Sequence, residues 1–321
     1  WVKGLYSISP ILEVVNKYGA ENIHSIVVMD YMSIALWRLM RYCSKKDIRL
    51  VIDTVDWFNK SEYKFPKNRI KDLDTLVRMK YIHKKAEYMI AISKYLYNYY
   101  KDRVKNLVMI PGTIDSNDIK WLAVKEYRGN EVLTFGYAGD PGKNFERERL
   151  DWLIRIISEL NRNGKRCKLI VAGVDKTIIM KNKPELFKLT GLQDNIIFLG
   201  KIPHMECLDM IASCDFSVII RENLLVNRAG FPTKLSESFG CGTPVISTPS
   251  GNVSDYIINN VNGFLTEDFS FDSFKKLIEE VVDIDKEKIL SMHYTTKQEN
   301  KLRYEYYNET IKKIIESENG I

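Results

Sequence analysis

Cysteine and histidine are scarce in this sequence of 321 residues, which contains five cysteines and four histidines. The histidines are not spaced as metal ligands or as partners in a Ser-His-Asp arrangement. The cysteines show no paired spacing, so neither a disulfide framework nor a zinc site is predicted. A reducing, cytoplasmic environment fits this use of cysteine.

Long hydrophobic runs are also absent, although hydrophobic residues make up 45% of the sequence. No run approaches the roughly 20 apolar residues that a transmembrane helix needs. Charged residues make up 28%, which is typical of globular proteins. At this length the chain is expected to form two domains, each able to bury its own core.

Acidic residues are under-represented in the first part of the sequence. Residues 1–115 contain 20 Lys and Arg but 12 Asp and Glu, whereas the remaining residues contain 28 and 30. This asymmetry favours an anionic partner for the first part, such as an anionic acceptor or a membrane surface. A solvated lysine-rich surface explains it equally well.

Apolar segments and helical patterns alternate in the first part, which predicts a parallel sheet with right-handed crossovers. Asp56 follows the second predicted strand, at the edge where open α/β sheets bind ligands, and is a candidate acceptor contact. A loop aspartate or a helix cap is the alternative interpretation. Strands are predicted at residues 23–29, 49–54, 89–93 and 107–110, and helices at 33–42 and 72–88.

Basic and aromatic residues are mixed at positions 60–71. Tyr63 and Phe65 would insert into a lipid surface if this segment contacted a membrane. A similar mixture occurs in nucleic-acid-binding segments, but no RNA- or DNA-binding signature accompanies it, so nucleic acid is not an expected partner. An ordinary surface loop is the third interpretation.

The second part repeats the alternation of strands and helices. After its first strand comes the loop Gly139-Asp140-Pro141-Gly142-Lys143-Asn144. The glycines allow close approach of the backbone to a ligand, and Lys143 can supply positive charge to a phosphate. A plain connecting turn is the alternative. Strands are predicted at residues 132–138, 168–173, 196–200, 215–220, 244–247 and 262–265, and helices at 149–161, 205–212, 272–282 and 298–316.

Residues 221–248 are the most informative stretch. A predicted loop carries Asn227 and Arg228, and a predicted helix follows. Pro232 suits the first position of that helix, because a proline there lacks an N–H group that would have no partner. Gly240 and Gly242 are predicted to end it.

The N-terminus of this predicted helix is a ready anion site, because its backbone N–H groups and dipole both favour negative charge. Lys234 and Glu237 are three residues apart and share a face. A phosphate-binding cation therefore lies beside a carboxylate that can accept hydrogen bonds from sugar hydroxyls. This pairing suits a nucleoside diphosphate, whereas a helix-to-strand turn of any α/β protein would explain only the glycines and prolines.

Residues 236–246 (SESFGCGTPVI) resemble the nucleotide-sugar signature of GT-B glycosyltransferases of the GT4 type. In that family, a first Glu is followed by seven residues and a second Glu. Glu237 matches the second position, but Ala229 occupies the first, which in the family lies by the donor sugar. The longer form NRAGFPTKLSES is similar to a subgroup found in polysaccharide assembly.

The resemblance implies an α/β protein of GT-B fold, in which two Rossmann-like domains face each other across a cleft. It divides the chain into an acceptor-side domain at 1–115, a nucleotide-sugar-binding domain at 116–297, and a helix at 298–321 that returns to the first domain. Family members begin with a strand, a glycine-rich loop and a helix that are not visible here. The first domain is therefore expected to be truncated at its N-terminus.

The implied function is transfer of a sugar from a nucleoside diphosphate sugar, preferably a UDP-sugar, to a glycan or lipid-linked glycan. The family retains configuration at the anomeric carbon, and the subgroup points to capsule, exopolysaccharide or O-antigen synthesis. No cofactor or metal is expected, and two D-x-D pairs, Asp72/Asp74 and Asp283/Asp285, are interpreted as surface charge. The protein is expected in the cytoplasm, with a peripheral contact to the inner face of the membrane as a further expectation.

The resemblance also assigns roles to residues. Lys143, Lys234 and Arg228 would neutralise the diphosphate and stabilise charge on the leaving group, and Glu237 would bind the ribose. His204 is interpreted as an exposed loop residue. The predicted donor-binding residues are Gly139, Gly142, Gly173, Ile202, Pro203, Arg221, Gly230, Phe231, Pro232 and Thr233.

Two other classes stay open. Ala229 is compatible with a non-catalytic subunit that binds a nucleotide sugar without turnover. A sugar-nucleotide epimerase or a phosphorylase on the same fold is the other class. Epimerases need paired acidic and histidine groups in the cleft, and phosphorylases carry a cofactor lysine in a longer chain; neither pattern is evident.

Overall fold

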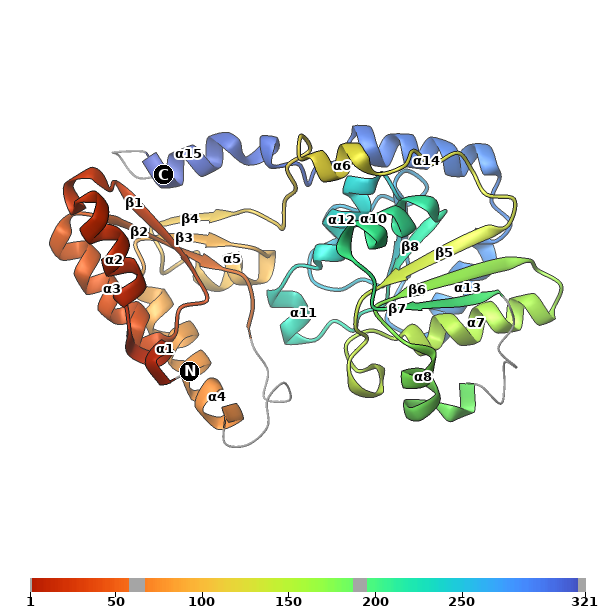
Figure 1. Cartoon of the computed structure of the whole chain (residues 1–321), viewed down its shortest axis with the longest axis horizontal. Coiled ribbons are helices and arrows are strands. Elements are labelled where there is room, and N and C mark those ends of the chain that lie inside the picture. Colours follow the sequence, from red (N-terminus) through yellow and green to blue (C-terminus); the bar gives the residue numbers. More distant parts are fainter. Residues whose placement is uncertain (1, 58–66, 187–194, 317–321) are drawn as a thin grey trace. The chain divides into compact units, whose positions relative to one another are not determined.

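The computed structural model describes residues 2–57, 67–186 and 195–316. The chain forms two compact units (Figure 1). Unit 1 contains the residues up to Gly112, the segment Leu225–Phe231 and the residues from Glu305 onward, and unit 2 contains Thr113–Leu224 and Pro232–Tyr304. The predicted boundaries at 115/116 and 297/298 differ from these by a few residues. The assignment of residues 225–231 to unit 1 was not predicted from the sequence.

Unit 1 is built on a parallel sheet with the strand order β1-β2-β3-β4. Its strands are β1 (Ser25–Met29), β2 (Arg49–Thr54), β3 (Tyr88–Ala91) and β4 (Asn106–Met109). Its helices are α1 (Val2–Tyr6), α2 (Ser9–Tyr18), α3 (Ser33–Lys46), α4 (Lys67–Val77), α5 (Lys94–Tyr100), α11 (Leu225–Ala229) and α15 (Asn308–Glu316).

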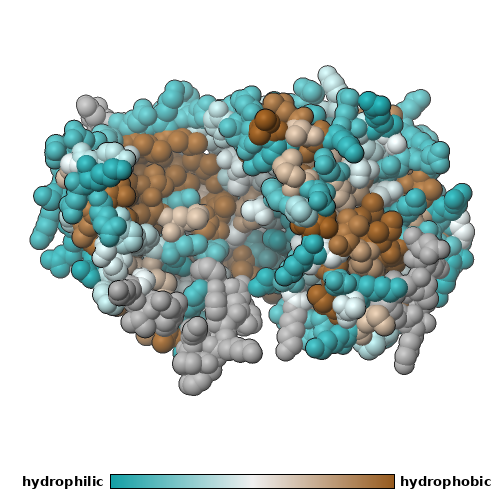
Figure 2. Space-filling model, viewed as in Figure 1, coloured by the Kyte–Doolittle hydropathy of each residue, from teal (hydrophilic) through white to brown (hydrophobic). Residues whose placement is uncertain are grey.

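The two faces of this sheet are covered differently. Ile52 and Met89 face a core that includes Leu36 and Leu39 of α3. On the other face, Ile314 of α15 packs against β2 and β4. On β1, Val27 and Met29 remain 46% and 59% exposed, and Figure 2 shows hydrophobic side chains gathered over the strands of this unit.

Unit 2 is built on a parallel sheet with the order β10-β9-β8-β5-β6-β7, in which the chain starts at a central strand and reverses direction between β5 and β8. This is the doubly wound order of Rossmann-like folds. Its strands are β5 (Leu133–Ala138), β6 (Cys167–Ala172), β7 (Ile196–Gly200), β8 (Phe216–Ile219), β9 (Val245–Ser247) and β10 (Gly263–Leu265). Its helices are α6 (Ile119–Ala123), α7 (Leu150–Arg162), α8 (Lys176–Asn182), α10 (His204–Ser213), α12 (Thr233–Cys241), α13 (Phe271–Val281) and α14 (Lys286–Gln298).

The core of unit 2 follows from the apolar composition of its central strands. Phe135 and Tyr137 of β5, and Phe216 of β8, are fully buried against the apolar face of α7. Strands that are covered on both faces carry nearly continuous apolar runs, as the sequence of this part predicts.

Several local predictions were wrong. The helix predicted at 72–88 is α4 followed by a π-helical turn (Arg78–Ile82) and a 3₁₀ turn (His83–Lys85), and Tyr88 begins β3. The helix predicted at 298–316 is broken, because α14 ends at Gln298 and α15 begins only at Asn308. Asp74 is not surface charge: it is 8% exposed, and its carboxylate accepts a hydrogen bond from the Ser33 N–H group at 2.7 Å.

Residues 225–241 also differ in detail from the prediction. Asn227 and Arg228 lie on the short helix α11 rather than in a loop. Pro232 is the N-cap of α12, one position before the predicted one, because its backbone is extended (ψ 103°). Gly240 lies inside α12, and Gly242 alone ends the helix, at a left-handed φ of 77°.

The segment at residues 60–71, for which lipid contact was one of three interpretations, lies outside the described residues as far as residue 66, and its remainder begins α4. Among the described helices, none combines the length and the apolar character required to cross a bilayer.

Candidate functional site

The carboxyl ends of β5 and β8, where the strand order of unit 2 reverses, define the candidate site. Open α/β sheets bind ligands at such a point because the connections to the two strands diverge there and leave a crevice. Gly139 directly follows β5, and Arg221 lies two residues beyond β8. The Thr248 hydroxyl fixes the Arg221 backbone, since it accepts from the N–H group at 2.9 Å and donates to the carbonyl at 2.7 Å.

Three charged side chains meet at the carboxyl ends of these strands. Glu148, in the segment before α7, accepts a hydrogen bond from Arg221 Nε at 2.7 Å and another from Lys234 Nζ. The Glu148 side chain is 1% exposed, and those of Arg221 and Lys234 are 24% and 16% exposed. One buried carboxylate thus holds two cations, which leaves one positive charge in excess.

The surroundings decide the charge states of this cluster. Burial alone would raise the pKa of the Glu148 carboxyl, but Lys234 and Arg221 outweigh it, and the pKa is lowered. Burial lowers the pKa of Lys234, and the attraction of Glu148 opposes this effect. Lys234 Nζ also lies 4.3 Å from the centroid of the Tyr137 ring, and burial together with the Glu148 charge raises the pKa of the Tyr137 hydroxyl. An ionised carboxylate and a neutral aromatic ring therefore position the lysine.

Two glycines make room for Lys234. Gly139 has a φ of +132°, and a Cβ atom there would lie 2.6 Å from Lys234 Cε. Gly173, after β6, has a φ of +89°, and its Cβ would lie 2.7 Å from the Gly139 carbonyl oxygen. The backbones after β5 and β6 therefore approach each other and the lysine more closely than any other residue type allows.

The N-terminus of α12 lies beside the cluster, because Lys234 belongs to the first turn of this helix. Its N-cap residue, Pro232, makes no side-chain capping hydrogen bond. The first N–H groups of a helix have no intrahelical acceptor, and together with the helix dipole they attract anions. The excess positive charge of the cluster and the N-terminus of the helix therefore both favour the binding of an anion.

Further along the same helix, Glu237 is paired with His204. Glu237 Oε1 lies 3.1 Å from His204 Nε2, and the two side chains are 36% and 57% exposed. His204 is the first residue of α10 and directly follows Ile202 and Pro203. The predicted donor-binding residues Ile202 and Pro203 therefore lead directly into the pair. His204 is exposed, as predicted, but its contact with Glu237 was not anticipated.

Other predicted site residues belong to unit 1. Arg228 lies on α11 with its guanidinium carbon 5.2 Å from the centroid of the Tyr95 ring. Ala229, at the position of the family's first Glu, is completely buried, and its carbonyl accepts a hydrogen bond from Ser93 Oγ at 2.8 Å. Gly230, Phe231 and Asp56 are also parts of unit 1.

The remaining predicted residues lie in unit 2. Gly142 follows Gly139 in the loop after β5, and Thr233 is the exposed first residue of α12. Lys143 begins a 3₁₀ turn (Lys143–Phe145), and its side chain lies outside the described part of the chain. In residues 2–57, 67–186 and 195–316, no three His, Cys, Asp or Glu side chains are grouped as ligands for a metal.

Glu148 was not among the residues predicted from the sequence. Glu146 and Glu148 both occur in the charged segment Phe-Glu-Arg-Glu-Arg, yet Glu146 is exposed while Glu148 is buried. No local signal separates the two, because the partners of Glu148 lie 73 and 86 residues further along the chain.

Comparison with known proteins gives a family match that covers most of unit 2. Residues 141–299 match the family model described as "Glycosyl transferases group 1". The chain is 24% identical over 258 residues to the uncharacterized glycosyltransferase MJ1069 of Methanocaldococcus jannaschii, and the match covers 76% of this chain and 61% of that protein. This chain thus spans less than two thirds of the relative's length.

Solved structures show the same fold at low sequence identity. Anabaena Alr3699/HepE in complex with UDP has a TM-score of 0.66 at 15% identity, covering 94% of this chain and 80% of that one. Sucrose-phosphate synthase from Thermosynechococcus elongatus has a TM-score of 0.66 at 15% identity, covering 95% and 76%. The two parallel sheets with their helices therefore form a GT-B fold, as predicted.

Proposed function

We propose that this protein is a retaining glycosyltransferase that uses a nucleoside diphosphate sugar. The match of residues 141–299 to the family model described as "Glycosyl transferases group 1" supports this proposal. The observation that carries the proposal is the Glu148–Arg221–Lys234 cluster beside the N-terminus of α12. Its excess positive charge and the N–H groups of the helix suit a diphosphate, since charge-assisted hydrogen bonds are the strongest that such a ligand can make.

The residues divide the chemistry as follows. Lys234 and Arg221 stabilise the negative charge that develops on the diphosphate as the bond to the sugar breaks. Glu148 holds both cations in position before the donor arrives, so less reorganisation is needed in the transition state. Glu237 accepts hydrogen bonds from the ribose hydroxyls, and His204 orients its carboxylate. The departing phosphate assists the acceptor hydroxyl, and no protein nucleophile takes part.

A UDP-sugar is the donor that we favour. Its support is the likeness to Alr3699/HepE, which has been solved with UDP and with UDP-glucose. We further propose that the acceptor is a glycan or lipid-linked glycan in surface polysaccharide synthesis, a role suggested by the Asn227–Ser238 sequence. The five cysteines are unpaired thiols, which suits a reaction in the cytoplasm. No metal is required in this proposal, because two cations and a helix terminus supply the charge.

Calorimetric titration of the chain with UDP, GDP and ADP tests the donor site. We expect one nucleotide to bind, with affinity lowered about tenfold or more by Lys234→Ala and by Glu237→Ala, since a hydrogen bond to a charged group contributes roughly 1.5–3 kcal/mol. Lys275→Ala and Glu279→Ala on α13 remove the same charges elsewhere in unit 2 and should leave binding unchanged. Binding should persist in EDTA. Equal affinity in all four variants would refute the site.

A non-catalytic nucleotide-sugar-binding subunit is the second candidate, and buried Ala229 is the observation that favours it. A carboxylate at this position would be desolvated inside unit 1, so the chain lacks an acidic group there. The two candidates predict the same nucleotide binding. Release of UDP from a UDP-sugar in the presence of glycan acceptors separates them, because only the transferase accelerates it.

A further inference from the structure

The strand β4 has one edge that no described strand pairs with. In a parallel sheet, the backbone groups of every second residue form hydrogen bonds with the same neighbouring strand. The N–H groups of Asn106 and Ile110 donate to β3 or its flanks, each at 3.0 Å, so Val108 between them also faces β3. The N–H and C=O groups of Leu107 and Met109 therefore point away from the sheet.

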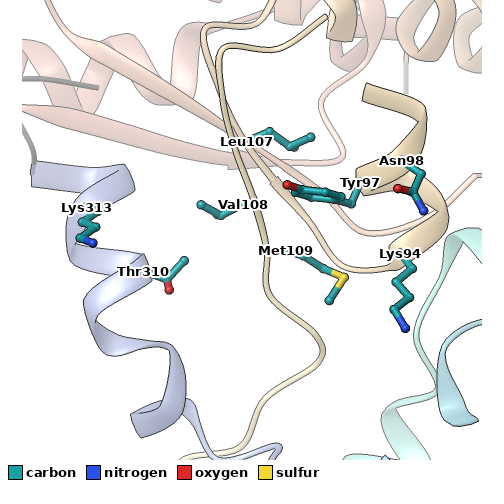
Figure 3. Close-up of a pocket in the computed structure, with 8 residues that line it drawn as sticks. All are labelled: Lys94, Tyr97, Asn98, Leu107, Val108, Met109, Thr310 and Lys313. Atoms are coloured by element: carbon teal, nitrogen blue, oxygen red, sulfur yellow. The ribbon is translucent and has the colours of Figure 1, made fainter. Parts of the chain in front are cut away.

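Two helices flank this open edge. Leu107 belongs to the core on the α5 side of the sheet, whereas Val108 packs with Ile314 of α15 on the other side. Between the helices lies a groove of about 570 Å³ (Figure 3). Its lining comes from three elements: β4 supplies Leu107, Val108 and Met109, α5 supplies Lys94, Tyr97 and Asn98, and α15 supplies Thr310 and Lys313.

The groove combines an apolar floor with positively charged rims. Figure 3 shows Lys94 and Lys313 on the two helices, on either side of the strand. Both lysines are exposed. The nearby acid Glu309 is paired with Lys312 at 3.5 Å. A ligand that fills the groove thus meets apolar side chains, outward backbone groups and two cations.

We propose that this groove binds an extended acidic peptide segment of a partner protein, which joins the sheet as a strand beside β4. The backbone of the segment bonds to Leu107 and Met109, as in other cases of strand addition to a sheet edge. Its alternate apolar side chains pack on the groove, and its Asp or Glu residues pair with Lys94 and Lys313. Because β4 has four residues, the paired part of the segment is about four residues long.

The charges argue against a second copy of this chain as the occupant. Pairing of two β4 edges would bring the like charges of Lys94 and Lys313 from both copies close together. Lysines at sheet edges commonly prevent such self-association. An acidic segment would instead be attracted by Lys94 and Lys313. The two lysines therefore disfavour a second copy of the chain and favour the proposed partner.

Selection of phage-displayed random heptapeptides on the full chain tests the proposal, with counterselection on Met109→Pro. Proline at this position removes an outward N–H group but no bond to β3, so the sheet should be preserved. We expect enriched peptides with alternating apolar residues, at least one Asp or Glu, and no proline in the paired part. Their affinity, measured by fluorescence anisotropy, should fall about tenfold in Met109→Pro and less than threefold in Met109→Ala.

A second variant keeps the test decisive if Met109→Pro does not fold. In Lys94→Glu/Lys313→Glu, selection should return basic rather than acidic peptides. The proposal is overturned by three results: no enrichment over the counterselected pool, peptides that bind wild type and Met109→Pro equally, or sedimentation of the wild-type chain as a dimer that Met109→Pro dissociates. The last result would assign the edge to a second copy.

Discussion

Glu148 and Lys234 form an ion pair at the carboxyl end of the central strand β5, with the carboxylate side chain 1% exposed and the lysine side chain 16% exposed. Buried ion pairs add little net stability, because removing two charges from water offsets most of their attraction. The pair is better explained by the site. Without Glu148, Lys234 and Arg221 would repel each other whenever the anionic ligand is absent.

Glu148→Gln should lower the free energy of unfolding of unit 2 by about 3 kcal/mol, because it leaves two largely buried cations without their counter-charge. A nucleoside diphosphate supplies negative charge at the same place. We therefore expect UDP to raise the thermal unfolding temperature more in the variant than in the wild type. Thermal unfolding with and without UDP measures both effects.

Glu146→Gln is the matched control, since Glu146 is exposed two residues earlier. It should change neither the unfolding temperature nor its response to UDP. Equal behaviour of the two variants would show that the buried carboxylate does not position the cations.

Gly139→Ala should abolish most nucleotide binding, because the added Cβ would lie 2.6 Å from Lys234 Cε and displace the lysine. Gly164→Ala is the control: Gly164 also has a left-handed φ, of +85°, but a Cβ there would meet no atom within 4 Å. Both variants should lose about 1 kcal/mol of stability from backbone strain. Calorimetry should show at least tenfold weaker UDP binding in Gly139→Ala alone.

Glu237→Ala should remove the preference for UDP over 2′-deoxy-UDP, since the proposed role of Glu237 is to accept a hydrogen bond from the ribose. His204→Ala should weaken UDP binding less, by about three- to fivefold, because His204 acts through the carboxylate that it contacts at 3.1 Å. Glu206 is exposed on α10, the helix that carries His204, and Glu206→Ala should leave UDP binding unchanged. A Glu237→Ala variant with unchanged discrimination would contradict the ribose assignment.

Acid should destabilise unit 2 through His293. This ring is stacked on Tyr127 with centroids 3.7 Å apart, and its Nε2 lies 3.1 Å from the Asp215 carbonyl oxygen. Burial lowers its pKa to about 4, against an ordinary value of 6.5. Between these two pH values the unfolded chain binds the extra proton, so His293 should cost about 3 kcal/mol of stability as the pH falls from 6.5 to 4.

Denaturant titrations of wild type and His293→Gln at several pH values measure this dependence. The difference in unfolding free energy between the two proteins should be constant above pH 7 and shift in favour of the variant below pH 6.5. Parallel pH curves would contradict the assignment.

The sequence predicted the parts of the fold whose signal is local. The bounds of β2 and β7 were predicted as observed, because each contains a short apolar run with polar residues close on both sides. The end of a helix was harder to predict where contacts with residues distant in sequence determine it. The π-helical turn after α4 contains buried Arg78, which pairs with Asp30 at 3.4 Å, and nothing in the helical pattern indicates that contact.

The same distinction applies to the site. Lys234, Glu237 and the glycines could be proposed from the sequence because their spacing lies within one loop or one helix turn. Glu148 and the His204–Glu237 pair were missed because each depends on residues 33 or more positions apart. The membership of Arg228 in unit 1 was equally hidden, since the short α11 packs on α5 rather than on its neighbours in sequence.

The packing of α15 on the first sheet has a consequence for synthesis on the ribosome. Ile314 is completely buried with Val51, Val108 and Ile110, so the core on this face is incomplete until α15 has emerged. At about 5–20 residues per second, roughly 10–40 s separate translation of Met109 from that of Ile314. Unit 2 needs no residue beyond Tyr304. The unit that begins first on the ribosome is therefore completed last, and during this interval its apolar strand face is open to chaperones and proteases.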